Sequence, residues 1–197
     1  LSKTMINFLA LLGWAYDDKT EFFTLDELIE KFDLDKLNKS PAVFNIDKLD
    51  WMNKKYIKDL SLDNLCRHLF NQAPEYPVEY NDLFRNVVEI ERDRLTTINF
   101  KEFWNNTSYF FIPPPKRNDL NKSVLIATIT YFKNYPYFDA ILDIALRDIA
   151  KGMHLTNKEF LGTLRDALTG SDKTPSISEI IRVLGIPETI KRLEYQI

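Results

Sequence analysis

Apolar residues recur along most of the chain at the three- and four-residue intervals of an amphipathic helix. Few segments alternate with the two-residue period of a strand, although residues 42–44 could form a short edge strand. The sequence therefore predicts a mainly α fold. The helical patterns cover residues 1–12, 25–32, 46–57, 62–70, 80–95, 99–104, 122–132, 141–149, 157–168 and 177–184, and a short helix that begins near Pro187.

Capping residues mark the ends of several of these helices. Thr24 with Glu27 and Thr156 with Glu159 have the spacing of a capping box, in which each side chain accepts a hydrogen bond from the other residue's backbone N–H. Glycines stand where the apolar stripes stop and can provide helix C-caps. These are Gly13, Gly152, Gly170 and Gly185.

The segment "FFIPPPKR", residues 110–117, is the clearest break in the helical pattern, since its three prolines have no N–H to donate. A compact helical region ends near residue 60. We therefore expect three parts, over residues 1–60, 61–116 and 117–197.

Composition narrows the class of protein. The 197 residues are 45% hydrophobic, which is enough to form hydrophobic cores. The net charge is −3, so the chain lacks the overall positive charge of a non-specific nucleic-acid-binding protein. Cys66 is the one cysteine, which excludes an internal disulfide. No apolar run reaches the length of a membrane span, and we expect no membrane partner.

Catalytic motifs are absent from the sequence. Cys66 and His68 are two residues apart on a predicted helix and would not face each other, so a hydrolase that uses them is a remote alternative. The two histidines and one cysteine do not make a usual zinc site. We assign no catalytic and no metal-binding residue.

Four segments occur in an informative order: "NFLALLGW" (7–14), "FTLDELIEKFDL" (23–34), "SPAVFNIDKLDWMNKKYI" (40–57) and "LRDALTG" (164–170). Together they resemble the bacterial and organellar glutamyl-tRNA synthetases. The resemblance covers residues 1–60 and 150–197 and is thinner between them.

This resemblance implies the family's stem-contact subdomain over residues 1–60, followed by an all-helical anticodon-binding bundle, the α-helix cage, in two subdomains. The catalytic domain, which uses ATP and Mg²⁺, would lie upstream of residue 1. We therefore expect a fragment without cofactors that is inactive alone. The Lys-, Asn- and Phe-rich composition favours a mitochondrial matrix enzyme, with the bacterial cytoplasm as the alternative.

The resemblance also assigns contacts to the anticodon. In bacterial members the segment that matches residues 165–177 faces the anticodon bases, which implies contacts from Arg165, Thr174, Pro175 and Ile177. A guanidinium can stack on or hydrogen-bond a splayed base, and a hydroxyl can bond a base edge. In the alternative interpretation, Arg165 caps helix carbonyls and Thr174-Pro175 begins a helix. Ser176 with Glu179 offers a competing start.

Further basic residues are assigned by position. Arg92 and Arg94 match the family's arginine-bearing helix near the third anticodon base; being two apart, only one is expected to contact that base, and Arg94 is favoured. The stem-contact subdomain would offer lysines to tRNA phosphates. These are Lys39, Lys54 and Lys55.

Two functions remain open at this level. The first is the tRNA-binding part of a glutamate–tRNA ligase, a monomer whose partner is glutamate tRNA and possibly glutamine tRNA. The second is a helical protein-interaction module without RNA binding. Phosphate-dominated binding weakens steeply with salt, whereas an apolar interface hardly responds, so salt dependence distinguishes the two.

Overall fold

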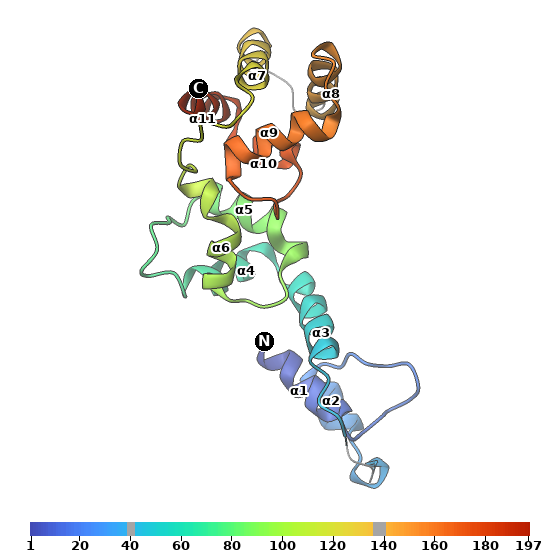
Figure 1. Ribbon diagram of the computed structural model, residues 1–197. Helices are drawn as coiled ribbons and strands as arrows, with labels where there is room; N and C mark the ends of the chain where they lie inside the picture. Colours follow the sequence, from blue (N-terminus) through green and yellow to red (C-terminus); the bar gives the residue numbers. More distant parts are fainter. Residues whose placement is uncertain (39–41, 136–140) are drawn as a thin grey trace. The chain divides into compact units, whose positions relative to one another are not determined.

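The computed structural model describes residues 1–38, 42–135 and 141–197 (Figure 1). Helices account for the regular structure of these residues, which confirms the mainly α prediction. Backbone contacts divide the chain into two compact units, and each is described by itself. The first unit is Leu1–Gln72 with Arg92–Asn99, and the second is Ala73–Glu91 with Phe100–Ile197. The expected division at residues 60 and 116 stays a prediction.

The first unit is built around the packing of α1 on α3 and α2. Its core holds aromatic and aliphatic side chains, with Phe8, Trp14, Met52 and Ile57 all at most 2% exposed. The helices of this unit are α1 (Ser2–Leu11), α2 (Leu25–Lys31), η1 (Leu34–Lys36), α3 (Ile46–Asp59), α4 (Leu62–Phe70) and η2 (Arg92–Arg94).

A buried asparagine ties the loop before α2 to α1. Asn7 is fully buried; its Nδ2 donates to the Glu21 carbonyl oxygen at 2.7 Å, and its Oδ1 accepts from the Phe23 N–H at 2.6 Å. The Tyr56 hydroxyl donates to the same Oδ1 at 3.0 Å. These partners offset the cost of burying the amide.

The suggested edge strand at residues 42–44 is wrong: these residues have no regular structure. Within the described ranges the extended pairing is an isolated antiparallel bridge between Trp14 and Leu37. Ladder hydrogen bonds need a partner strand, and no strand lies beside residues 42–44 in the part of the chain that the structure describes. An apolar triplet without such a partner stays irregular.

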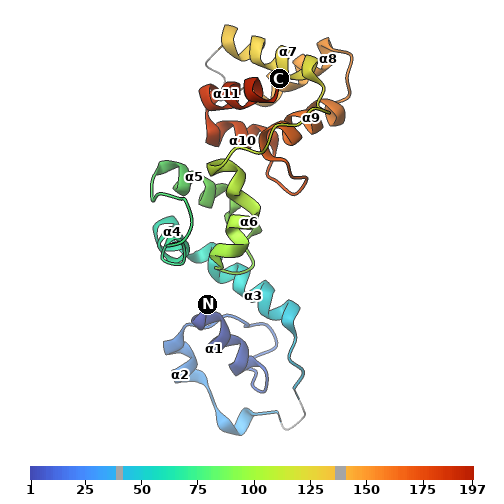
Figure 2. The ribbon, with the colours of Figure 1, turned by 60° about the vertical axis from the view of Figure 1, so that its left-hand side comes forward.

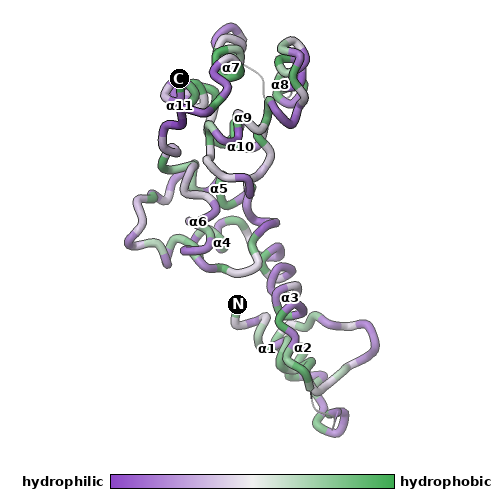
Figure 3. The backbone as a smooth tube through the Cα atoms, viewed as in Figure 1, coloured by the Kyte–Doolittle hydropathy of each residue, from purple (hydrophilic) through white to green (hydrophobic). Residues whose placement is uncertain are grey.

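The second unit holds α5 and the helices from α6 onward, and α9 packs against α6, α7, α8, α10 and α11 (Figure 2). Both hydrophobic and hydrophilic residues occur along each of these helices (Figure 3). Phe84, Phe103, Phe132 and Phe160 are at most 1% exposed in its core. The helices are α5 (Asp82–Glu91), α6 (Phe100–Phe111), α7 (Lys122–Asn134), α8 (Leu142–Gly152), α9 (Asn157–Thr169), α10 (Ile177–Leu184) and α11 (Ile186–Gln196).

The capping signals confirm two of the predicted helix starts. Thr24 with Glu27 and Thr156 with Glu159 each form both hydrogen bonds of a capping box. Helix α8 ends at Gly152 as predicted, although the C-cap is Met153 and the left-handed backbone follows at His154, with φ of 56°. The break at the three prolines is confirmed, because α6 ends at Phe111.

Candidate nucleic-acid interface

The loop between α9 and α10 forms a polar corner, defined here as Arg165 together with residues 170–176. Helix α9 ends at Thr169, and Gly170 follows in the left-handed conformation with φ of 64°. Ser176 caps α10 and shares a capping box with Glu179. The competing helix start is therefore the real one, and the interpretation of Thr174-Pro175 as a helix start is wrong.

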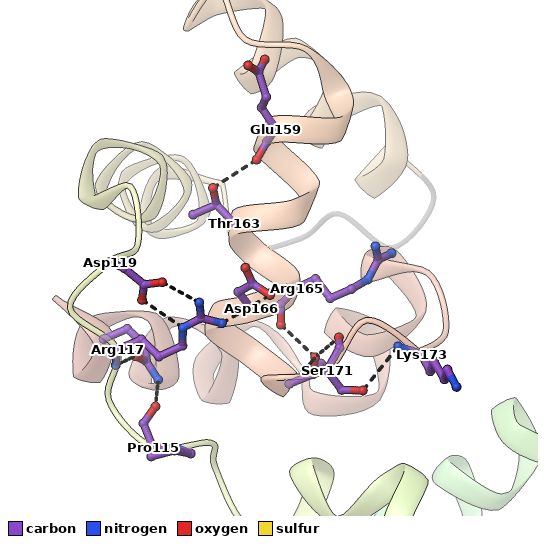
Figure 4. A network of polar contacts seen from close by, with 11 residues as sticks. Pro115, Arg117, Asp119, Glu159, Thr163, Arg165, Asp166, Ser171 and Lys173 are labelled. Atoms are coloured by element: carbon purple, nitrogen blue, oxygen red, sulfur yellow. Dashed lines mark hydrogen bonds and ion pairs between the residues drawn. The ribbon is translucent and has the colours of Figure 1, made fainter.

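Arg165 and Thr174 face each other across this corner. The Arg165 Nε donates to the Thr174 Oγ1 at 3.1 Å, and the Thr174 hydroxyl donates to the Pro175 carbonyl oxygen at 3.1 Å. Both residues are half-buried. The bond from Nε fixes the plane of the guanidinium, whose two terminal nitrogens make no hydrogen bond or ion pair to any residue in the described ranges. Figure 4 shows the side chain reaching away from the neighbouring carboxylate of Asp166.

The other two residues of the predicted anticodon contact are buried. Ile177 is 2% exposed and belongs to the core of the second unit, and Pro175 is buried as well. Their side chains therefore pack beneath the corner in this structure. Any contact that they make with an unpaired base would need the loop to move, so Arg165 and Thr174 carry the accessible chemistry.

The two arginines near residue 93 differ in their surroundings. Arg92 is half-buried, and its guanidinium donates to the carbonyl oxygens of Lys58, at 2.6 Å, and Leu60, which close the end of α3. Arg94 is exposed. Both lie in η2, a 3₁₀ turn, and not in the α-helix that the sequence predicts over residues 80–95.

The lysines assigned to tRNA phosphates are exposed where they are described. Lys54 and Lys55 are neighbours on α3 and form no ion pair with a residue of the described ranges. Lys39 lies outside the described residues. The neighbouring Lys58 pairs with Asp93 at 2.9 Å, which offsets its charge.

The pair considered for hydrolysis does not form a site. Cys66 is fully buried in the core, whereas His68 is exposed two residues later on α4. Among the described residues there is no cluster of three or more His, Cys, Asp and Glu side chains that could hold a metal ion. No helix in those ranges is both long enough and apolar enough to cross a membrane.

Sequence reasoning missed a set of polar residues near the corner. Glu188, Arg192 and Gln196 stand four residues apart on α11, and Arg192 and Gln196 are at most 5% exposed. Arg117, in the proline-containing segment, pairs with Asp166 on α9 at 3.5 Å. The sequence signal that could have revealed them is the four-residue spacing of these polar residues on the last helix, which places them on one helix face.

The family of anticodon binding domains matches residues 62–197. A second family, described as the catalytic domain of class I tRNA synthetases (E and Q), matches residues 1–51. That range covers α1, α2, η1 and the beginning of α3.

The relatives are bacterial. The chain is 31% identical to glutamate–tRNA ligase 1 of Pseudothermotoga lettingae and 33% identical to glutamate–tRNA ligase of Dehalococcoides mccartyi. The alignments cover 98% of this chain and 42% and 43% of those proteins, so the chain spans less than half the length of these relatives. They give no support to the expected mitochondrial location.

The fold is likewise shared with solved structures. A glutamate tRNA ligase from Elizabethkingia meningosepticum superposes with a TM-score of 0.85 at 24% identity, over 100% of this chain and 41% of that one. The structure from Elizabethkingia anophelis gives 0.80 at 23% identity. The helical fold, the similarity to glutamate–tRNA ligases and the family match over residues 62–197 agree: this chain belongs to the anticodon binding domain family.

Proposed function

We propose that this chain is the tRNA-binding and anticodon-reading part of a glutamate–tRNA ligase, with glutamate tRNA as its partner. The relatives favour this function over a protein-interaction module, because proteins named glutamate–tRNA ligase align with 98% of the chain. Their bacterial sources favour a bacterial cytoplasm as the compartment. The proposed state is a monomer, which light scattering would test.

The observation that carries the proposal is the orientation of Arg165. Its Nε is occupied by the Thr174 hydroxyl at 3.1 Å, while its terminal nitrogens have no partner among the described residues. A guanidinium held in this way presents its two terminal NH₂ groups and a flat face to an incoming group, which suits a splayed base. In a tRNA, the unpaired bases of the anticodon loop can be splayed out in this way.

Arg94 and the lysines of α3 would add a second kind of contact. Arg94 is exposed and Arg92 is half-buried, so we propose Arg94 as the base contact of the pair. Exposed Lys54 and Lys55 would meet phosphates. Contacts of this kind release counterions and make the affinity fall with salt.

Residues 1–51 match the catalytic-domain family, but more than half of each relative lies outside the alignment, and we assign the chemical step of such a ligase to that part. We assign the binding of ATP and Mg²⁺ to that part of the ligase as well. The role that we propose for this chain is to bind and orient tRNA, so that its distant acceptor end reaches the site of the chemical step. We expect the chain alone not to aminoacylate.

Fluorescence anisotropy with a labelled glutamate tRNA transcript tests the proposal. We expect binding that weakens steeply between about 50 and 200 mM salt and falls when the anticodon loop is replaced. Arg165→Ala should weaken binding to the intact tRNA about tenfold and hardly affect the tRNA with the replaced loop.

A charge-matched control separates this contact from general electrostatics. Arg147 is exposed on α8 and is not one of the residues of the corner, so Arg147→Ala removes the same charge from another helix and should leave anticodon dependence unchanged. Competition with glutamine tRNA then measures discrimination. Absence of binding at low salt to both tRNAs would contradict the proposed function and favour the protein-interaction module.

A further inference from the structure

The segment that joins α6 to α7 is held by the side chain of Gln196. Residues 113–115 are prolines and cannot donate hydrogen bonds. Gln196 is 1% exposed, and its Nε2 donates to the carbonyl oxygens of Pro115 at 3.2 Å and Pro114 at 3.4 Å. Its Oε1 accepts from the Arg117 N–H at 2.8 Å. One buried amide therefore fixes three backbone groups of this segment.

A second side chain of α11 fixes the point where the segment begins. Arg192 is 5% exposed and donates to the carbonyl oxygens of Tyr109 and, at 2.9 Å, Phe110, in the last turn of α6. Its Nε donates to Glu188 Oε1 at 2.8 Å. These carbonyls lack helical partners, and a cation is favourable at a helix C-terminus. The segment is thus anchored at both ends to α11.

The anchored segment reaches the last turn of α9 at two places. The Arg117 guanidinium binds Asp166 Oδ1 at 3.5 Å and is oriented by Asp119, which accepts from Nη2 at 2.6 Å and Nε at 3.0 Å. Pro114 lies beside Gly170: a Cβ added to that glycine would be 3.4 Å from the Pro114 Cβ. Figure 4 shows Arg117 between the two carboxylates.

That last turn of α9 also carries the polar corner. Asp166 follows Arg165 directly, and the Thr169 hydroxyl lies 2.8 Å from the Arg165 carbonyl oxygen and 3.0 Å from that of Ser171. The Thr169 oxygen also accepts from the Ser171 N–H at 3.1 Å. A shift of this turn would therefore move both the Arg165 backbone and the start of the loop that carries Thr174.

We infer that Arg117 and Asp166 are positioning residues for the Arg165–Thr174 pair, and that Arg117 acts through Asp166 and not by touching RNA. This inference rests on the proposed function of the corner. Two carboxylates already offset the charge of Arg117. Because α11 holds the proline-containing segment, the ion pair between Arg117 and Asp166 also holds the last turn of α9 in place.

The decisive variant is Asp166→Asn. It removes a negative charge next to an anionic ligand, so simple electrostatics predicts equal or tighter tRNA binding. Loss of positioning predicts the opposite: affinity for the glutamate tRNA transcript should fall about threefold to tenfold, with little change for the transcript with the replaced anticodon loop. The ion pair is partly exposed, so the thermal midpoint should hardly change.

Double variants separate positioning from direct contact. Arg117→Gln should weaken binding as much as Asp166→Asn, and combining either with Arg165→Ala should cost nothing more, since all three act through the same guanidinium. The slope of affinity against salt should be the same for Arg117→Gln as for the unaltered chain. Additive losses, or a shallower salt slope for Arg117→Gln, would mean direct phosphate contact and overturn the inference.

Glu194→Gln is the matched control. Glu194 pairs with Lys133 at 2.7 Å, both side chains are about half exposed, and the contact lies between α7 and α11. It also removes one negative charge, and should leave affinity unchanged. If the unaltered chain reads the anticodon but Asp166→Asn binds tRNA as tightly as Glu194→Gln does, the positioning role is wrong and the proposed function still holds. If the unaltered chain shows no anticodon dependence, the proposed function fails first.

Discussion

The guanidinium of Arg92 donates a hydrogen bond to the carbonyl oxygen of Lys58 at 2.6 Å. A second bond reaches Leu60, so one side chain binds carbonyls that the end of α3 leaves without helical partners. These hydrogen bonds hold the 3₁₀ turn η2 against the end of α3 within the first unit. Arg94, two residues later in the same turn, is exposed.

The two arginines should therefore respond differently to substitution. Arg92→Ala removes the donor to two carbonyls and should lower the free energy of unfolding by about 1–2 kcal/mol, measured by urea titration. Arg94→Ala, at an exposed position, should lower the free energy of unfolding less than Arg92→Ala and should weaken tRNA binding about tenfold. Anisotropy measures the binding. The reverse pattern, a stable but non-binding Arg92→Ala and an unfolding-prone Arg94→Ala, would exchange their roles.

Gly170 should resist substitution more strongly than any glycine inside a helix. Its φ of 64° is costly for a residue with a Cβ, and the added atom would meet Pro114 at 3.4 Å. Gly170→Ala should lower the free energy of unfolding by about 1–2 kcal/mol, measured in urea. It should also weaken anticodon-dependent binding, because Gly170 begins the loop to Thr174.

Gly162, inside the helix that Gly170 follows, provides the comparison for this change. It lies inside α9, and a Cβ added there meets no atom within 4 Å outside its own helix. Gly162→Ala should raise the free energy of unfolding by about 0.5–1 kcal/mol, since alanine loses less backbone freedom on folding. A stabilised Gly170→Ala would contradict the assignment of strain to the left-handed position.

Local signals in the sequence predict much of the helical architecture. The stripe over residues 62–70 and the capping box at Thr156 correspond to α4 and to the start of α9. Helix α6 is the instructive difference: its pattern ends near Trp104, yet the helix continues to Phe111. The intervening Asn, Thr and Ser residues are weak helix formers, and burial of Thr107 and Phe110 in the second unit overrides that preference.

The same distinction between local sequence signals and long-range packing applies to the candidate site. Arg165 and Thr174 are nine residues apart at a helix end, so their proximity follows from local punctuation. The pairing of Arg117 with Asp166 joins residues far apart in sequence, and it depends on how α11 anchors the proline-containing segment. Burial of Ile177 also depends on packing, because an apolar stripe gives a helix face without saying which end of it is covered.

Loss of the buried Arg192 should destabilise the second unit. Arg192→Leu keeps an apolar stem but leaves the Tyr109 and Phe110 carbonyls in the last turn of α6 without this donor. The expected loss is about 2–3 kcal/mol in the free energy of unfolding, measured by urea titration. Lys191→Ala, at a neighbouring position that is 80% exposed, should change it by less than about 0.5 kcal/mol. Equal effects of the two variants would remove the C-capping role.

The capping box at the start of α9 gives a pH dependence with a definite sign. Hydrogen bonds from the Thr156 hydroxyl and then from the Thr156 backbone N–H hold the pKa of Glu159 below its ordinary value of 4.5. A carboxyl whose pKa is lowered in the folded state stabilises it above the unfolded pKa, and this contribution disappears as the pH falls through the folded pKa. Glu159→Gln should therefore be less stable than the unaltered chain at pH 7, and the difference should shrink from about pH 5 downward.

Thr156→Ala isolates the larger of the two causes. It removes the hydroxyl and keeps the backbone N–H, so the pKa of Glu159 should rise part of the way toward 4.5. The carboxyl carbon chemical shift of Glu159, followed by NMR through the acid titration, measures that pKa directly in both chains. An unchanged midpoint in Thr156→Ala would show that the hydroxyl does not hold the carboxylate, and the pH dependence of stability would then have to come from other carboxyl groups, such as Asp143, whose pKa Ser178 and Arg182 lower.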